Sequence, residues 1–338
     1  MPERIGSDTL FLPTRPGVLG HAAVAGKKEA AGPLAAHFDQ TFTDSRIGMK
    51  TWEQAEAKMQ TEAVRLAFAK AKLQPAAAQA VFAGDLLNQC ISSTFGLREL
   101  GVPFIGQYGA CSTIAQSAAV AAVFVDSGAC QNAAAVTSSH FCTAERQFRL
   151  PLEYGGQRTP TAQWTATAAG ALVLGQTGGT VGVEHVTFGR ITDLGVTDPA
   201  NMGAAMAPAA AATLQAFFTD THTTPNDYDG VFTGDLGLVG SALLVQLLQK
   251  NGIDLSQKHR DCGLLLYDRE KQDTHAGGSG CGCAASVLCG YILNEMEAGR
   301  LHNVVLAATG ALMSTTSSQQ SESIPGISHL IHLVRKAE

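Results

Sequence analysis

Charged residues are scarce in this chain. Asp, Glu, Lys and Arg make up 15% of its 338 residues, whereas about 25% is usual for a globular domain. The net charge is −6 and no block of Lys or Arg occurs, so no basic field exists to attract nucleic acid or an anionic membrane surface. The low charge indicates wide buried helices and sheets, or a surface that docks on another molecule.

Long apolar runs are also missing. No stretch of 18 or more apolar residues occurs, so we expect no transmembrane span. The first 20 residues hold three prolines with charges between them, which is not the pattern of a secretory signal peptide. Eight cysteines in a chain of this length do not resemble a secreted disulfide framework. We therefore expect synthesis in the cytosol, with any membrane contact made through partners.

Internal repetition is what the chain does have. Val81–Leu86 returns 150 residues later as Val231–Leu236, in the shared pattern Val-Phe-x-Gly-Asp-Leu. Cys111 and Cys281, 170 residues apart, each open an Ala-rich segment. Two features that repeat in the same order predict two copies of one α/β unit. We assign residues 1–180 and 181–338 to the two halves, related by a pseudo-twofold axis that brings Cys111 near Cys281.

Helical periodicity alternates with short apolar runs along most of the chain, which predicts α/β layers with buried sheets. Residues 1–50 are expected to form an irregular arm, and 277–280 a flexible turn. We expect a helix over 51–72, with Thr51 as its cap and Gln54 completing a capping box. Further helices are expected at 112–125, 206–218, 241–250 and 283–296, and strands from 81 and at 103–108, 133–136, 170–174, 181–188, 230–233, 262–267 and 304–308.

Cys111 stands where a strand and Gly109-Ala110 lead into a helix. A thiol there feels the positive end of the helix dipole, so we expect a lowered pKa and an available thiolate. This geometry suits a nucleophile that accepts an acyl group. The alternative is a small buried cysteine that packs at a strand–helix junction.

Several segments resemble known families. Gly109–Ser112 before an Ala-rich helix is similar to the nucleophile motif of the thiolase and ketoacyl synthase superfamily, as Gly280–Ser286 and Ala307–Leu312 are to its later turns. This resemblance implies a layered α-β-α-β-α fold. Longer segments resemble the stage V sporulation protein AD family: Trp52–Glu56, Ala83–Gln89, Thr137–His140, Ala144–Arg149, Met206–Ala211 and Ser323–Gly326.

The chain departs from the synthases where their chemistry resides. Their histidine would fall in the turn after the strand at 230–233, which here reads Gly234–Gly237. Their asparagine would fall at or beside Cys281, and a thiol cannot replace an amide's donor and acceptor. Cys111 is therefore predicted to be a vestigial nucleophile and the protein not an enzyme. His275 could serve as a replacement base, or be an exposed loop residue.

The resemblance implies non-enzymatic binding of dipicolinic acid, alone or with calcium, for uptake into the developing spore. It implies membrane proteins of the SpoVA channel complex as partners, and a peripheral place at the inner membrane of the forespore and spore. No cofactor is expected, and homodimer formation is left open. The rival hypotheses are an acyltransferase that uses Cys111 with His275, and a structural subunit of the channel with an empty pocket.

We expect the ligand near Cys111, Ser138 and the Gly310 turn, with Trp52 and Glu56 at the margin. A planar dianion needs a stacking surface and polar donors. The complete candidate set is Cys111, Ser138, Ser139, Trp52, Glu56, His140, Cys281 and Gly310. The hydroxyls have a simpler explanation as turn residues, and Trp52 as packing.

Other candidates are cations and cysteines. Arg146, Arg149 and Arg158 are the best local cations, although Glu145 and Glu153 lie close enough in sequence to pair with them. Cys281, Cys283 and Cys289 lack the spacing of a zinc site, so no metal is predicted.

Overall fold

The first strand of the core comes from a segment expected to be irregular. A computed structural model describes residues 1–148 and 158–336, and in it β3 (Gly17–Ala25) runs through the centre of the main sheet. The prediction of an irregular arm over 1–50 is therefore wrong. Eight of the nine residues of β3 are buried, because the strand is covered on both faces, and its run of small apolar residues has no polar alternation that would reveal a strand.

The main sheet has the same strand plan at both ends. Its order is β12-β11-β14-β15-β10-β3-β9-β7-β5-β6, so each strand of one half has a counterpart in the other. The N-terminal half-sheet contains β3, β5 (Ala80–Gly84), β6 (Phe104–Gly106), β7 (Asn132–Ser139) and β9 (Ala168–Gly175). The C-terminal half-sheet contains β10 (Val181–Phe188), β11 (Gly230–Thr233), β12 (His259–Asp261), β14 (Asn303–Ala311) and β15 (Gly326–Arg335). β3 and β10 pair at one residue pair only, Gly17 with Gly182, and β2 (Thr9–Phe11) adds a further pairing with β10.

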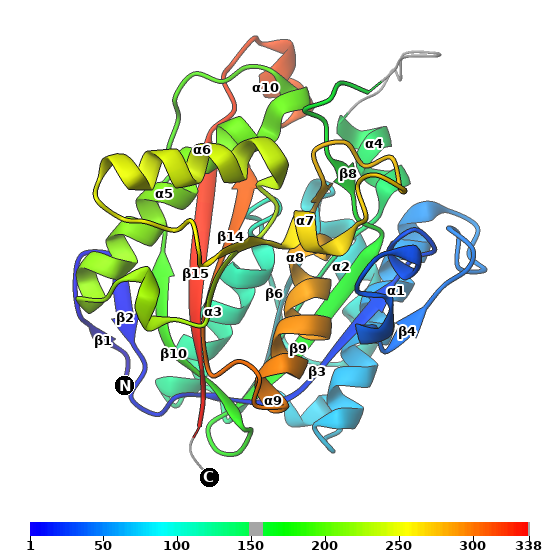
Figure 1. The fold of residues 1–338 in the computed structure, drawn as a ribbon. Coiled ribbons are helices and arrows are strands. Elements are labelled where there is room, and N and C mark those ends of the chain that lie inside the picture. The colour runs from blue at the N-terminus through cyan, green and yellow to red at the C-terminus, as the bar shows by residue number, and fades with distance from the viewer. Residues whose placement is uncertain (149–157, 337–338) are drawn as a thin grey trace.

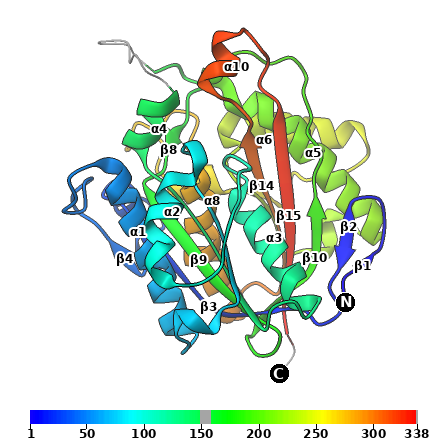
Figure 2. The same ribbon diagram turned by 180° about the vertical axis from the view of Figure 1, so that it is seen from behind.

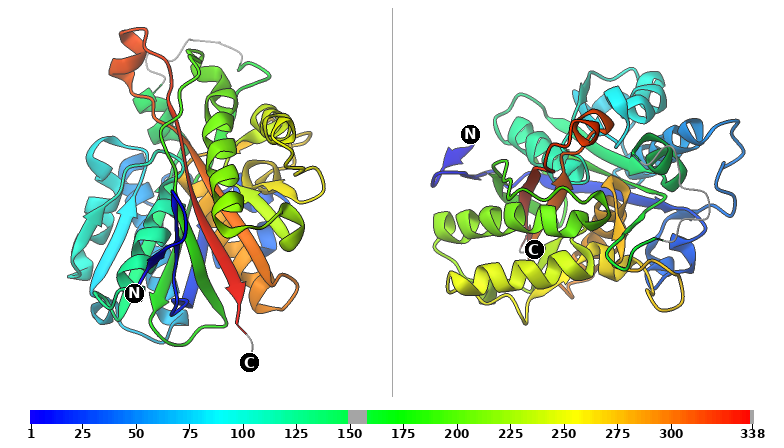
Figure 3. Two further views of the ribbon diagram at one scale, coloured as in Figure 1. Left: turned by 90° about the vertical axis from the view of Figure 1, so that its left-hand side faces the viewer. Right: turned by 90° about the horizontal axis from the view of Figure 1, so that it is seen from above.

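Helices form three layers around these half-sheets (Figure 1). α1 (Trp52–Lys70) packs on the outer face of β3, β9 and β7, with α2 (Ile91–Leu97) against it (Figure 2). α3 (Thr113–Asp126) and α8 (Cys281–Val287), one from each half, lie between the half-sheets. α5 (Met202–Thr221) covers β14 and β15, and α6 (Gly237–Lys250) packs on α5 (Figure 3). Three separate apolar cores fill the spaces between these layers.

The remaining elements are short. They are the strands β1 (Glu3–Arg4), β2 (Thr9–Phe11), β4 (Gln40–Thr41), β8 (Trp164–Thr165) and β13 (Gly278–Ser279), and the helices α4 (Phe141–Phe148), α7 (Cys262–Leu266), α9 (Leu293–Glu297) and α10 (Thr315–Gln319). A π-helical turn, Leu288–Ile292, joins α8 to α9. Within the described residues, no helix is both long and apolar enough to cross a membrane.

Two local predictions need correction. Residues 262–267 were expected to form a strand, but Cys262–Leu266 is the helix α7. The Asp261 carboxylate accepts a hydrogen bond from Leu264 N and caps this helix, a local signal that the apolar run hides. The 277–280 segment is not a free turn, because Gly278–Ser279 pairs with Trp164–Thr165. The boundary at residues 180 and 181, which falls just before β10, stays a prediction.

Candidate functional site

The candidate site lies where parallel strands end. β5 pairs in parallel with β7, and β11 with β14, so the carboxyl ends of each pair meet at one edge. Asp85 follows β5 and Asp235 follows β11, while Thr309 lies near the end of β14. The turns that lead into α3 and α8 reach the same place and carry Cys111 and Cys281.

Cys111 sits in a tight turn before α3. Ala110 takes a positive φ of 49°, a backbone conformation that costs energy for a residue with a side chain. Two hydroxyls hold the turn: Ser112 Oγ donates to Gly109 O at 2.7 Å, and Thr113 Oγ1 donates to Ala110 O at 2.5 Å. Gly310 packs against this turn so closely that a Cβ there would lie 2.3 Å from Gly109 O.

The predicted meeting of Cys111 and Cys281 is confirmed. Both belong to one small buried cluster, and Cys281 Sγ donates to Ala110 O at 2.9 Å. The prediction that the Cys111 thiol has a lowered pKa is wrong. Burial raises the pKa of Cys111 well above its ordinary value, and the neighbouring Asp235 carboxyl and Cys281 raise it further. Desolvation and adjacent negative charge outweigh the helix dipole, since both disfavour a thiolate.

Asp235 is the site residue that the sequence reasoning missed. Its Oδ2 accepts from Gly280 N at 2.9 Å, its Oδ1 accepts from Thr309 Oγ1 at 2.8 Å, and the Cys111 thiol is its third partner. Complete burial raises the pKa of Asp235 to about 7. The repeated Gly-Asp-Leu motif contained the signal, because the same aspartate recurs in both halves.

A second buried polar group joins β7 to α1. Glu56 is fully buried; its Oε1 accepts from Ser138 Oγ at 3.1 Å and its Oε2 accepts from Thr143 Oγ1 at 2.7 Å. Burial, and then the charge of Asp85, raise the pKa of Glu56 to about 8. Gln60 Nε2 donates to Ser138 Oγ at 3.3 Å and extends the network. Ser138 therefore faces the outer helix layer rather than Cys111.

Ser139 and His140 make hydrogen bonds that hold the backbone around the end of β7. Ser139 Oγ donates to Ala166 O at 2.7 Å and accepts from Gly282 N at 3.0 Å, which anchors the start of α8. His140 donates from Nε2 to Ser45 O at 2.7 Å, and its Nδ1 accepts from Cys142 N at 3.1 Å. Both ring nitrogens of His140 are thus engaged in structural bonds. Ser138 and Ser139 face opposite sides of β7, as strand alternation requires.

Trp52 and the arginines lie at the surface. Trp52 has Arg46 and Arg146 at 5.4 and 5.6 Å from its ring, and Arg146 is ion-paired with Glu53. Arg158 pairs with Asp273 at 3.3 Å. Arg149 and Glu153 lie outside the described residues, so the structure does not place them.

His275 lies on a loop between α7 and β13. Its Nδ1 bonds Thr159 O at 2.6 Å, and its Nε2 lies 2.9 Å from Asp273 Oδ1. The loop interpretation of His275 is supported, because both ring nitrogens are occupied away from Cys111. Cys281, Cys283 and Cys289 are buried within the α8 segment.

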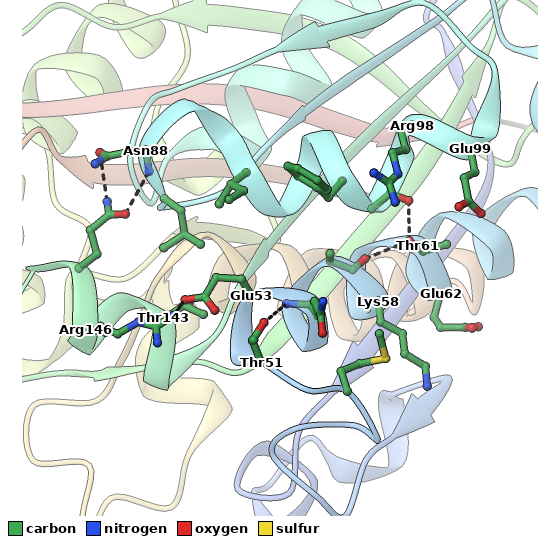
Figure 4. A pocket seen from close by; sticks show the side chains of 18 residues that line it. Thr51, Glu53, Lys58, Thr61, Glu62, Asn88, Arg98, Glu99, Thr143 and Arg146 are labelled. Carbon is green, nitrogen blue, oxygen red and sulfur yellow. Dashed lines mark hydrogen bonds and ion pairs between the residues drawn. The ribbon is translucent and has the colours of Figure 1, made fainter.

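Two cavities flank the loop after β5 and the helix α4. The one beside Cys111 measures about 50 Å³ and is mostly apolar, although Tyr108, Glu145, Thr165 and Ser279 also line it. The other, which we name the α1–α2 cavity, measures about 860 Å³. Both charge signs line it, as Figure 4 shows: the cations are Lys58, Arg98 and Arg146, and the carboxylates are Glu53, Glu62 and Glu99. Small-molecule sites generally measure about 300–1,000 Å³, so only the second has that size as it stands.

Comparisons with known proteins agree with this architecture. A family model described as Stage V sporulation protein AD (SpoVAD) matches residues 6–334. Stage V sporulation protein AD of Bacillus subtilis (strain 168) is 46% identical over 305 residues, which cover 90% of this chain and 90% of that protein. The family resemblance expected from the motifs is therefore confirmed.

Solved structures match over nearly the whole chain at low identity. Cerulenin-bound OleA of Xanthomonas campestris has a TM-score of 0.61 at 14% identity, covering 99% of this chain and 100% of that one. 3-oxoacyl-(acyl-carrier-protein) synthase III of Aquifex aeolicus VF5 has a TM-score of 0.60 at 12% identity, covering 94% and 99%. At identities this low, the structural match over nearly the whole chain shows a common fold and no more, and the predicted thiolase-like layered fold is confirmed.

Proposed function

The chain belongs to the stage V sporulation protein AD family, and from that premise we propose that it binds dipicolinic acid without acting on it. The observation that carries this proposal is the replacement of the synthase machinery around Cys111. The turn after β11 presents Asp235 to the thiol, and the residue opposite is Cys281. Neither supplies the paired donors that stabilise an oxyanion.

Proton transfer from Cys111 to Asp235 is unfavourable. The pKa of the thiol lies well above 9.0 and that of the carboxyl is about 7. Burial and the adjacent carboxylate both disfavour the thiolate, so the proton of the pair stays on sulfur. This argues against the rival acyltransferase, in which Cys111 must attack an acyl group.

We propose the α1–α2 cavity as the ligand site on grounds of size and chemistry. Phe95 is 55% exposed there and offers a face for a flat ring. The Arg98 guanidinium lies 5.1 Å from that ring and takes part in no ion pair within the described residues. A stacking face beside a cation is what a planar aromatic dianion requires. The sequence-based alternative, binding beside Cys111, requires that its 50 Å³ pocket open.

The partners implied by the family remain part of the proposal. We propose that the protein works with membrane proteins of the SpoVA channel complex and lies peripherally at the forespore inner membrane. A homodimer through β6 is also proposed. β6 ends the main sheet; Phe104 within it and Tyr108 just after it are 41% and 47% exposed. Open strand edges readily pair with a second chain.

Calorimetric titration with dipicolinate tests both the function and the place. It is done with and without calcium on wild type, Cys111→Ala, Arg98→Ala and the control Arg260→Ala, which removes an exposed arginine on β12. We expect one saturable site that Arg98→Ala weakens about tenfold or more and Arg260→Ala leaves unchanged. If only Cys111→Ala weakens dipicolinate binding, the ligand site is the Cys111 pocket.

Two further results would overturn the binding function itself. Absence of binding together with acyl transfer from an acyl-CoA to Cys111 would establish the enzyme. Absence of both, with recruitment to membranes by the partner proteins intact, would establish the structural subunit.

A further inference from the structure

Two histidines and a glutamate meet far from Cys111, where β10 pairs with β15. His185 and His332 are directly opposite in the antiparallel register. Their Nδ1 atoms lie 2.8 Å apart, and Glu184 Oε2 lies 3.7 Å from His185 Nδ1 and 3.6 Å from His332 Nδ1. These three atoms form a compact triangle of metal-binding ligand types. We call these residues the Glu-His-His cluster.

A strand irregularity makes this meeting possible. Neighbouring residues in a regular strand point to opposite faces, so Glu184 and His185 should be separated. The register between β10 and β15 shifts between Val183 and His185, and such bulges re-aim side chains. The glutamate can therefore reach the two imidazoles. β2 continues the sheet on the other side of β10, with Phe11 opposite His185.

Neighbouring groups orient the three side chains. His332 Nε2 bonds Asn303 Oδ1; because the amide oxygen only accepts, the proton is on Nε2 and the Nδ1 lone pair faces the cluster. Arg15 is ion-paired with Glu184 Oε1, which leaves Oε2 for the imidazoles. Supporting bonds of this kind from ligand to protein are typical of metal sites.

Both histidines remain neutral near neutral pH. Burial, followed by the charge of Arg15, lowers the pKa of His185 to about 4. Burial, His185 and Arg15 lower the pKa of His332 to about 3. Metals bind the neutral ring, so no proton has to leave the protein. His185 need only move its proton from Nδ1 to Nε2.

We propose that the Glu-His-His cluster binds one divalent transition metal ion, with zinc as the reference ion, and clips β10 to β15. Tetrahedral zinc with bonds of about 2.0–2.1 Å separates its ligand atoms by roughly 3.3 Å. The imidazole nitrogens would part by about 0.5 Å and the carboxylate would approach by about 0.3 Å. Two nitrogen ligands disfavour calcium, which prefers six to eight oxygens. This site is independent of the proposed dipicolinate function.

Metal titration of the untagged, metal-free full chain tests this site. In calorimetry with zinc we expect one equivalent to bind wild type, and Glu184→Gln and His185→Gln to weaken binding at least tenfold. His329→Gln is the matched control, because His329 is also a largely buried histidine on β15 but lies outside the cluster. Zinc should raise the melting temperature of wild type and the control by a few degrees, and calcium should not.

Cobalt absorption identifies the ligands. We expect the spectrum of a tetrahedral nitrogen and oxygen site, lost in Glu184→Gln. A thiolate charge-transfer band would put the ion on cysteines and overturn the proposal. The proposal would also be overturned if wild type did not bind zinc, if both cluster variants bound zinc as tightly as wild type, or if calcium raised the melting temperature as much as zinc does. If His185→Gln does not fold, the near-isosteric Glu184→Gln carries the comparison.

Discussion

Replacing Glu56 by glutamine tests whether a protonated carboxyl is built into the core beside β7. Glutamine has nearly the same shape and no charge. Its carbonyl can accept from Ser138 Oγ, as Glu56 Oε1 does. Thr143 Oγ1 also donates to His140 O at 2.9 Å, so it can turn its proton there and accept from the new amide. The hydrogen bonds survive, and only the titration disappears.

The magnitude follows from proton linkage. The pKa of Glu56 is about 8 in the folded protein, against 4.5 for an ordinary glutamate. Between these values the unfolded chain is ionised and the folded protein keeps its proton, so stability is greatest at low pH and falls as pH rises towards 8. The slope is about 1.4 kcal/mol per pH unit. From pH 6 to pH 8 the free energy of unfolding should drop by about 2 kcal/mol through this group.

Urea unfolding at pH 6 and pH 8 measures this difference. We expect Glu56→Gln to lose about 2 kcal/mol less than wild type between the two values. Asp235, whose pKa is about 7, titrates in both proteins and cancels. Glu62→Gln is the control, since Glu62 is on the same helix but pairs with Arg65 at the surface, and it should follow wild type. Equal pH dependence in wild type and Glu56→Gln would refute the buried, protonated carboxyl.

Two more predictions concern the Cys111 turn. Iodoacetamide should label Cys111 at pH 8 at least tenfold more slowly in the folded protein than in the urea-unfolded chain, since burial and Asp235 raise the pKa of the thiol. Asp235→Asn should speed labelling of the folded protein. Labelling is followed by peptide mass spectrometry, and rapid labelling of folded wild type would contradict this prediction. Gly310→Ala should lower the free energy of unfolding by about 1–3 kcal/mol, because the new Cβ would lie 2.3 Å from Gly109 O. Gly106→Ala is the control, because the nearest atom to its new Cβ would be 3.4 Å away. It should melt within a degree or two of wild type.

The two copies of the Gly-Asp-Leu motif have diverged in what their aspartates do. The Asp85 carboxylate bonds its own loop and α2: it accepts from Leu87 N at 2.9 Å and from Ser93 N at 2.8 Å. In the second copy, Asp261 accepts from the loop amides, which frees Asp235 to reach Cys111. A repeated sequence thus places two acids at equivalent strand ends, and the neighbours decide which of them enters the site.

Local patterns determined much of the fold. The repeat at Val81 and Val231 revealed the duplication, and the Thr51 cap marked the start of α1, where Thr51 Oγ1 accepts from Gln54 N. These signals act within a few residues or recur along the chain. The strand β3 was not predicted, because a strand covered on both faces shows no alternation of apolar and polar residues in the sequence.

Tertiary structure alone decided the properties of the site. A pKa depends on burial and on charges brought close by folding. The sequence around Cys111 suggested a lowered pKa, but burial raised it, and so did Asp235, 124 residues away. The Glu-His-His cluster likewise joins residues 147 positions apart through one shifted register. Sequence determines which side chains are available, whereas distance and desolvation, which only the packed chain defines, determine what they can do.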